Sequence, residues 1–387
     1  MKSRTGTKIG KDKKIPVARP YLWGQELGRL REALDNGWLS SQTPIVEEFE
    51  REFGRAVGAR HCVAACNGTA ALHLALLAAG VQPGDEVLVP DFSMIAPAFA
   101  VCYCGARPVP IDADETWNID ITQIARNVTP KTRAIIAVHT YGHPCRIEEL
   151  MFIAKEHGLI VIEDAAEALG ATSNGRAVGS LGDVGCHSFY ANKIITTGEG
   201  GMLTTQDEDL YRRARWKSNM CFGESPETRF EHAEIGHNYR LSGLLAAVGL
   251  AQLSFLTESV AGKIAIAERY NERLCEIPGL ELPPAAAWVR SVYWAYCILV
   301  DEPTFGVNRA TVQRLLHRVG IETRRAFTPV HRQPFLDMKS NGGEFPVSLR
   351  LMEQGILLPS FAGLTDTEID RIANILLDIR ARRLVER

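Results

Sequence analysis

The sequence lacks both a long hydrophobic run and a strong net charge. No stretch of about 18 consecutive apolar residues occurs, although 46% of the residues are hydrophobic, so we expect no membrane-spanning helix. The formal net charge is only −3 at pH 7, which gives no reason to expect a nucleic acid as partner. An anionic ligand would have to be held by local groups.

The cysteine patterns of secreted and zinc-binding proteins are also missing. The nine cysteines are odd in number and lack the dense spacing of a disulfide scaffold, and no apolar signal segment precedes them. Cys62 with Cys66, and Cys102 with Cys104, have no second Cys or His pair at zinc-site spacing. We therefore expect buried free thiols, no metal and a reducing, cytoplasmic location.

Complete nucleotide fingerprints and internal repeats are absent too. Gly198, Gly200 and Gly201 resemble part of a dinucleotide fingerprint, but they follow a lysine rather than a first strand, so we do not expect nicotinamide binding. His139 and His143 are separated by residues that disfavour one continuous helix, and no third ligand is evident. This pair therefore does not predict a metal site.

The length of 387 residues suggests two domains. Residues 1–14 are basic and almost without apolar side chains, which predicts a disordered arm. From residue 15 to 256 we expect a large domain, and from 257 to 387 a smaller α+β domain. Within the large domain, apolar runs alternate with helical stretches, at 86–90, 107–111, 134–138 and 159–162. This alternation predicts βαβ units and a mostly parallel sheet.

An amine and a carboxylate within residues 158–202 suggest a cofactor site. Asp164 follows the apolar run 159–162, so it should lie at the carboxyl edge of the sheet, where ligands bind in open α/β folds. Lys193 lies downstream, among aromatic residues and glycines. Meeting in one pocket, the lysine could form a Schiff base with pyridoxal phosphate (PLP) and the aspartate could pair with its ring nitrogen. On residue types alone, a helix cap and a solvated lysine are the commoner explanations of these two residues.

Two further turns are candidate ligand loops. The segment 66–72 places small residues and a threonine before a helix, where backbone amides can approach an anion, although capping explains the pattern as well. The turn 37–41 is either a substrate loop or a plain helix-ending turn.

Five motifs occur in order along the chain, at 67–72, 163–166, 188–193, 198–201 and 238–240. Together they resemble the DegT/DnrJ/EryC1/StrS sugar aminotransferases over nearly the whole chain from about residue 16. The resemblance implies a fold-type-I PLP architecture. It has a seven-stranded, mostly parallel sheet in a large domain, a smaller α+β carboxyl-terminal domain, and a homodimer with active sites shared between subunits.

The resemblance also implies roles for single residues around the cofactor ring. Lys193 would be the Schiff-base lysine, and Asp164 would pair with the pyridine nitrogen. Glu167 occupies the position of a residue that often contacts the phenol oxygen. Met94 stands where the family commonly has an aromatic stacking face, so its thioether would make a softer contact.

Other carried-over roles concern the phosphate of the cofactor. Gly68, Thr69 and Ser188 would hold it within one subunit. Asn238 would reach it from the neighbouring subunit.

The substrate side is expected in loops. Trp38, Leu39 and Ser40 would shape the sugar pocket. Arg240 would pair with a carboxylate of the donor or with a sugar phosphate, or bridge subunits, and His331 is the second candidate for substrate contact.

Within the family, segments 116–120, 141–144, 193–202 and 327–334 resemble the GDP-perosamine synthase subgroup. That likeness implies amination at carbon 4 of a nucleotide-linked 4-keto-6-deoxy sugar, with glutamate as amino donor and the cofactor alternating between PLP and pyridoxamine phosphate. UDP-, dTDP- or CMP-linked sugars and eight-carbon sugar acids remain alternatives. Two further alternatives are a dehydratase, in which the family replaces the lysine with histidine, and a non-catalytic sensor. Lys193 argues against the dehydratase.

Overall fold

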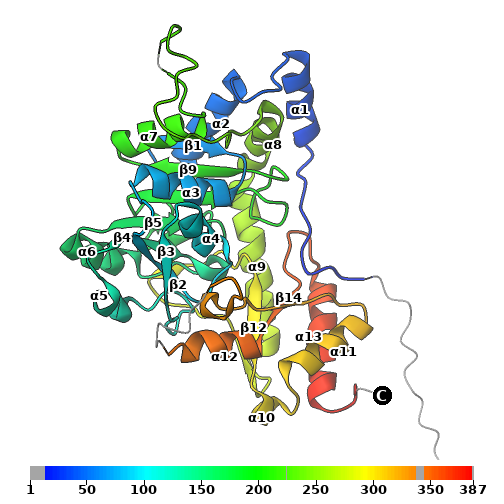
Figure 1. The fold of residues 1–387 in the computed structure, drawn as a ribbon. Helices are drawn as coiled ribbons and strands as arrows, with labels where there is room; N and C mark the ends of the chain where they lie inside the picture. Colours follow the sequence, from blue (N-terminus) through cyan, green and yellow to red (C-terminus); the bar gives the residue numbers. More distant parts are fainter. Residues whose placement is uncertain (1–13, 224, 337–343, 386–387) are drawn as a thin grey trace, which may run out of the picture.

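The computed structural model describes residues 14–223, 225–336 and 344–385 (Figure 1). The predicted basic arm, residues 1–14, lies outside these ranges except for Lys14. The large sheet has the strand order β1-β9-β8-β5-β4-β2-β3. Its strands are β1 (His61–Ala65), β2 (Glu86–Pro90), β3 (Arg107–Ile111), β4 (Thr132–Val138), β5 (Ile160–Asp164), β8 (Val184–Ser188) and β9 (Gly201–Thr205).

The pairing of these strands confirms the predicted seven-stranded, mostly parallel sheet. The neighbours from β3 through β8 are all parallel, whereas β9 runs antiparallel to β1 and to β8. Strands β2 and β4 are almost entirely buried, which explains why they appear in the sequence as continuous apolar runs.

Helices cover both faces of this sheet. They are α1 (Glu26–Asp35), α2 (Pro44–Val57), α3 (Gly68–Ala78), α4 (Ala96–Tyr103), α5 (Ile124–Asn127), α6 (Ile147–His157), α7 (Glu208–Ser218) and α8 (Gly243–Leu253), with the 3₁₀ turns η1 (Ile121–Gln123) and η2 (Thr140–Gly142). Helix α3 is apolar on all sides and packs among β1, β8 and β9. This burial sets the start of α3 beside the ends of those strands.

The carboxyl-terminal part is built on α9 (Leu256–Leu274) and a four-stranded antiparallel sheet. The strands, in sheet order, are β10 (Leu280–Glu281), β12 (Tyr296–Val300), β14 (Gly355–Leu358) and β13 (Arg324–Arg325). The remaining helices are α10 (Glu302–Phe305), α11 (Arg309–Arg318), η3 (Val330–Arg332), α12 (Pro346–Gln354) and α13 (Asp366–Arg380). In Figure 1, α9 runs from the large sheet to this part, so it links the two regions.

Two boundaries differ from the sequence expectations. Helix α9 begins at Leu256, where the charge pattern predicts a start near residue 261, and it meets α8 at a 63° bend. The sequence also predicts a strand over residues 293–300, but β12 begins at Tyr296, because Tyr293 has a positive φ of 46° that a strand does not accept.

The predicted domain boundary at residue 256 stays a prediction, and contacts cross it. Ile15 packs in the carboxyl-terminal core and bridges to Ile321. A small third sheet pairs β11 (Val289–Arg290) with β6 (Thr172–Ser173), and β6 with β7 (Arg176–Ala177). The chain therefore returns to the large domain before it enters β12.

Over the described ranges, no single helix is long and apolar enough to cross a membrane. Only the bent pair α8 and α9, taken together, passes that test by length and composition.

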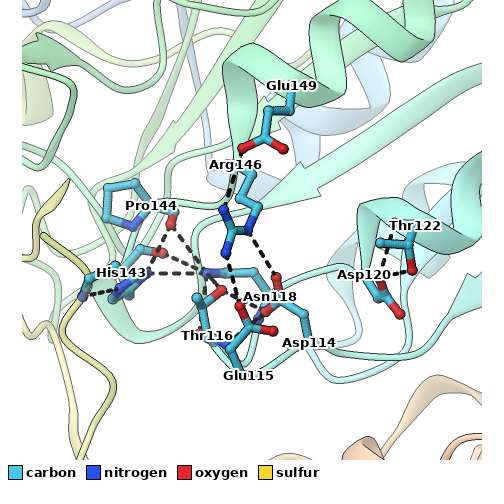
Figure 2. A network of polar contacts seen from close by, with 11 residues as sticks. Asp114, Glu115, Thr116, Asn118, Asp120, Thr122, His143, Pro144, Arg146 and Glu149 are labelled. Carbon is cyan, nitrogen blue, oxygen red and sulfur yellow. Dashed lines mark hydrogen bonds and ion pairs between the residues drawn. The ribbon is translucent and has the colours of Figure 1, made fainter. Parts of the chain in front are cut away.

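A buried polar network joins the loops after β3 and β4 (Figure 2). The Asn118 amide nitrogen donates to the carbonyl oxygen of His143 at 3.2 Å, and its oxygen accepts from the backbone N–H of Thr140 at 2.9 Å. At the rim of this network, Arg146 pairs with Glu115 at 2.9 Å. Segments 116–120 and 141–144, which carry the subgroup resemblance, are thus held together by Asn118.

Candidate active site

A cavity of about 750 Å³ opens at the carboxyl ends of β4, β5 and β8. Its wall contains seven of the residues predicted for the site, namely Gly68, Thr69, Met94, Asp164, Glu167, Ser188 and Lys193. The carboxyl ends of parallel strands lie at the same edge of the sheet, which explains why residues distant in sequence meet there.

The strand register brings the start of α3 beside Ser188. Gly201 of β9 pairs with Ala65 of β1 on one side and with Ser188 of β8 on the other. A Cβ atom on Gly201 would lie 2.5 Å from the carbonyl carbon of Asn67, and one on Gly68 would lie 2.9 Å from the Cβ of Ser188. Glycine is therefore required at both positions for this close approach.

The first turn of α3 offers donors to an anion. The Asn67 side chain accepts from the N–H of Ala70 at 2.8 Å, and the Asn67 carbonyl accepts from Ala71 at 3.1 Å. The N–H groups of Gly68 and Thr69 precede these bonds and have no partner within the helix. With the Ser188 hydroxyl beside them, they suit a phosphate group.

Asp164 is the last residue of β5 and is 6% exposed. Burial raises the pKa of its carboxyl, while the N–H of Ala166, which donates to it at 3.0 Å, and the charge of Lys193 act in the opposite direction. A buried carboxylate of this kind favours a cationic partner. The protonated ring nitrogen expected of the cofactor meets that requirement.

Behind Asp164 lies a buried pair of His139 and Glu163. The His139 Nε2 is 3.0 Å from Glu163 Oε2, and the same carboxylate accepts backbone N–H groups from the turn at 179–182. Burial opposes the charge of Glu163, but these hydrogen bonds hold its pKa below the ordinary value. His143 bonds instead to the Pro144 carbonyl, at 2.9 Å. No group of three or more residues able to hold a metal ion occurs in the described part of the chain.

Lys193 is held in a loop at the centre of the cavity wall. Its Nζ lies 3.8 Å from Glu167 Oε1 and 3.9 Å from the ring centre of Trp294. Burial lowers the pKa of the amine, whereas the charges of Glu167 and Asp164 raise it. Burial also raises the pKa of Glu167 to about 7, against the effect of Lys193. An amine with a lowered pKa is available as a nucleophile and as a base.

The wall also contains polar atoms without a hydrogen-bond partner, and one exposed apolar side chain. Ser93 Oγ and Asn192 Oδ1 are buried and have no hydrogen-bond partner within the described residues. Met94 is 49% exposed, and its sulfur accepts from the N–H of Ala96 at 3.1 Å. The wall thus combines phosphate donors, a carboxylate, an amine and an apolar side chain, which fits the cofactor expected from the sequence.

Six predicted residues do not line this cavity, and their roles stay predictions. Arg240 donates to Asn238 at 2.7 Å and to Asn219 at 2.5 Å. Arg240 and Asn238 therefore lie together, outside the cavity wall. Residues 38–40 pack near the start of α8, where the Gly243 N–H donates to the Ser40 carbonyl at 2.9 Å. The six are Trp38, Leu39, Ser40, Asn238, Arg240 and His331.

His331 is oriented by a buried carboxylate. Its Nδ1 lies 2.7 Å from Asp91 Oδ2, and its backbone N–H donates to Asp91 Oδ1 at 2.8 Å. Its ring also stacks on Phe345 at 4.4 Å between centroids. The imidazole is therefore fixed in direction, beside the loop that carries Met94.

Sequence reasoning assigned no site role to the other residues of the wall, among them Trp294 and Arg324. Trp294 reaches Lys193 from the turn before β12, and Arg324 comes from the short edge strand β13. Neither lies in a recognisable local motif, since both enter the cavity only through the packing of the carboxyl-terminal sheet against the large domain. An aromatic residue in a predicted strand carries no separate signal for a ligand site.

Comparison with known proteins agrees with this site. The DegT/DnrJ/EryC1/StrS aminotransferase family matches residues 21–377. A GDP-perosamine synthase of Caulobacter vibrioides is 41% identical over 362 residues, covering 93% of this chain and 96% of that protein. One of Escherichia coli O157:H7 is 38% identical over 358 residues, covering 92% and 96%. The crystal structure of DesI in the presence of its TDP-sugar product superposes with a TM-score of 0.89 and 34% identity, covering 96% and 94%.

These findings establish the class of the protein. The fold is that of the fold-type-I aminotransferases, and the family depends on pyridoxal phosphate. The predicted cofactor and the predicted enzyme class, a PLP-dependent sugar aminotransferase, are confirmed. The chain belongs to the DegT/DnrJ/EryC1/StrS aminotransferase family.

Proposed function

We propose that the protein transfers the amino group of glutamate to carbon 4 of a GDP-linked 4-keto-6-deoxy sugar. Glutamate leaves as 2-oxoglutarate, and the keto sugar leaves as the amino sugar. The observation that carries the proposal is the position of the Lys193 amine, 3.8 Å from Glu167 in a cavity that also contains Asp164. The choice of sugar is supported by the relatives, which at 41% and 38% identity are GDP-perosamine synthases.

Residues of this chain would hold each part of the cofactor. Gly68, Thr69 and Ser188 would bind the phosphate, Asp164 would pair with the ring nitrogen, and Lys193 would bind the aldehyde carbon. When bound, PLP supplies an electron sink that stabilises negative charge on the substrate carbon and carries the amino group between the two substrates.

Lys193 would have a second task once its amine is free. Because burial lowers its pKa, the Nζ atom would be able to accept a proton from the substrate and hold it for transfer to the cofactor. Asp164 would keep the ring nitrogen protonated through a charge-assisted hydrogen bond, which strengthens the electron sink. Glu167 would lie beside the phenol oxygen and tune the charge of the lysine.

The active form would be a homodimer with shared sites. Asn238 lies outside the cavity of its own chain, as a residue serving the partner would. Large apolar side chains are also exposed on nearby elements, including Leu27, Leu39, Phe230 and Ile235, with 52% to 82% of their surface accessible. Exposed apolar residues at this density suit a subunit interface. In the dimer, residues 38–40 and Arg240 would complete the sugar pocket.

A cytoplasmic location accompanies this proposal. All nine cysteines are free thiols, and eight of them are at least partly buried. Unpaired thiols suit a reducing compartment.

Purified protein loaded with PLP provides the test. The visible absorbance band of the bound cofactor should disappear on adding glutamate and return on adding a GDP-linked 4-keto-6-deoxy sugar. UDP- and dTDP-linked keto sugars are the comparison substrates, and restoration by one of them instead would change the assigned nucleotide. Lys193→Ala is the control, since it should bind the cofactor without turnover. A wild-type band that glutamate leaves unchanged would contradict the transaminase.

A further inference from the structure

Lys263 on α9 is a buried lysine whose polar contacts are all uncharged. It is 6% exposed, and its Nζ donates to the carbonyl oxygens of Trp294 at 2.8 Å and Ser360 at 2.7 Å, and to the Ser360 hydroxyl at 2.5 Å. Its three donors thus meet three acceptors. Within the described residues no charged group offsets the burial of this amine, which lowers its pKa to about 7. Burying an ammonium group without a counter-charge is costly, so its position calls for an explanation.

Trp294 connects this lysine to the active site. Its carbonyl accepts from Lys263, while its indole Nε1 donates to the carbonyl of Asn192 at 2.8 Å. The face of the same indole lies 3.9 Å from the Nζ of Lys193. One residue therefore contacts both amines, one through its backbone and one through its side chain.

The backbone at Trp294 is not held by a regular element. Strand β12 begins at Tyr296, and the preceding Tyr293 has a φ of 46°. The neighbouring Val292 is attached to the large domain by a bond from its N–H to the Gly142 carbonyl, at 3.1 Å. Lys263 therefore supplies an anchor at the point where neither sheet holds the chain.

We propose that Lys263 is a positioning residue for the active site, because its side-chain amine donates to the Trp294 carbonyl, anchors the Trp294 turn and so keeps the indole face against the amine of Lys193. The inference rests on the proposed function, since it assigns Lys263 to the support of the cofactor-binding lysine. It concerns a residue that lies outside the cavity wall and contacts none of the reacting groups.

The indole changes the charge balance around Lys193. The charged groups facing that amine are Glu167 and Asp164, both on the segment at the end of β5. From the opposite element, Trp294 presents an aromatic face, whose negative quadrupole stabilises an ammonium ion. If the indole moves away, the ammonium form of Lys193 loses this stabilisation and its pKa falls. The neutral, nucleophilic amine then predominates at a lower pH.

The rate at which cofactor-free protein regains its visible absorbance band on mixing with PLP reports the pH at which the Lys193 amine loses its proton, a midpoint that includes its coupling to Glu167. Only the neutral amine attacks the aldehyde, so the rate rises with pH through the pKa of Lys193. For Trp294→Leu, the midpoint of this pH profile should fall by roughly half a unit to one unit. For Lys263→Met, it should fall in the same direction by at least about 0.3 unit. Stopped-flow absorbance from about pH 6 to about pH 9 measures both.

Lys217→Met is the matched control. Lys217 is 7% exposed on α7, and its Nζ bonds to the Ile235 carbonyl at 3.0 Å and to Glu234 at 2.6 Å. The same loss of a buried lysine, at a side chain that bonds to residues 234 and 235 instead of to Trp294, should leave the midpoint at its wild-type value. Lys263→Gln, which keeps a polar group, serves if Lys263→Met does not fold by circular dichroism, and its midpoint should fall likewise.

Each result decides the matter. A lower midpoint in the Lys263 variant, but not in Lys217→Met, supports the inference. A midpoint unchanged from wild type, with Trp294→Leu shifted, overturns the role of Lys263 and leaves the proposed function intact. A wild-type protein that gains no band with PLP overturns the proposed function and this inference with it.

Discussion

The carboxylate of Glu167 lies 3.8 Å from the amine of Lys193, and both side chains are withdrawn from solvent. Burial penalises each charge, while their attraction favours both. The result is a carboxyl group whose pKa rises to about 7 beside an amine whose pKa is lowered. The charge of the lysine in the cofactor-free protein therefore depends on the protonation of Glu167 near neutral pH.

Replacing Glu167 with Gln should change how stability depends on pH. In wild type the pKa of the Glu167 carboxyl rises from 4.5 in the unfolded chain to about 7 in the folded protein. Between these values the folded protein keeps a proton that the unfolded chain has released, so the free energy of unfolding falls as pH rises. The free energy of unfolding of Glu167→Gln should not fall in this way. Relative to wild type it should rise by about 2 kcal/mol between about pH 5 and pH 7.

Urea unfolding of the cofactor-free proteins at the two pH values measures the difference. Glu258→Gln, an exposed carboxylate on α9, is the control and should parallel wild type. If the stability of Glu167→Gln changes with pH as that of wild type does, the pKa of Glu167 is not raised in the folded protein.

Gly68→Ala should weaken cofactor binding. The added Cβ would lie 2.9 Å from the Cβ of Ser188, which forces the start of α3 away from the phosphate donors. We expect the Kd for PLP to rise at least about tenfold, as for the loss of one charge-assisted hydrogen bond. Titration of the visible band gives the Kd. Gly262→Ala on α9, where a Cβ meets nothing within 4 Å, should bind PLP as wild type does.

Asp164→Asn should slow turnover more than it weakens cofactor binding. The amide keeps the shape of the side chain but cannot hold the ring nitrogen protonated, so kcat should fall at least about 100-fold while the Kd for PLP changes less than about tenfold. Asp183→Asn is the matched control, because this carboxyl also accepts a backbone N–H, from Val161 at 2.8 Å, at the far end of the same strands. Its loss should lower stability and spare kcat. Wild-type turnover in Asp164→Asn would remove the assigned role.

Met94→Phe should tighten cofactor binding. Met94 is 49% exposed at the cavity wall, and an aromatic ring there would stack on the cofactor. Aromatic stacking contributes about 0.5–1.5 kcal/mol beyond burial, which corresponds to a Kd about two- to tenfold lower. Met94→Leu separates stacking from apolar contact and should leave the Kd near its wild-type value. An equal gain in both variants would argue against stacking.

The arrangement of the large domain could be predicted from local patterns. The runs at 86–90 and 107–111 are strands with those same bounds, because buried parallel strands need apolar side chains on both faces. The small residues at 66–72 predict a helix start that an anion can approach, and the structure adds that Gly68 and Gly201 each lie against a neighbouring strand or helix start. Period and residue type therefore carry enough information to place the cofactor motifs at one sheet edge.

The turn at Trp294 could not be predicted in the same way. Its contact with Lys193 depends on the bend between α8 and α9, on the positive φ of Tyr293 and on the anchor from Lys263. None of these follows from hydrophobic periodicity. They result from packing between segments that lie far apart in the chain.

By itself, the sequence determined the mostly parallel sheet, the order of the motifs and the identity of Lys193 and Asp164 as the candidate amine and carboxylate. Only the tertiary structure decided which groups surround that amine. Glu167 and Trp294 reach it from opposite elements, and the degree of burial decides its charge. The physical reason is that side-chain periodicity is a local property, whereas desolvation and charge pairing depend on every segment that packs around the site.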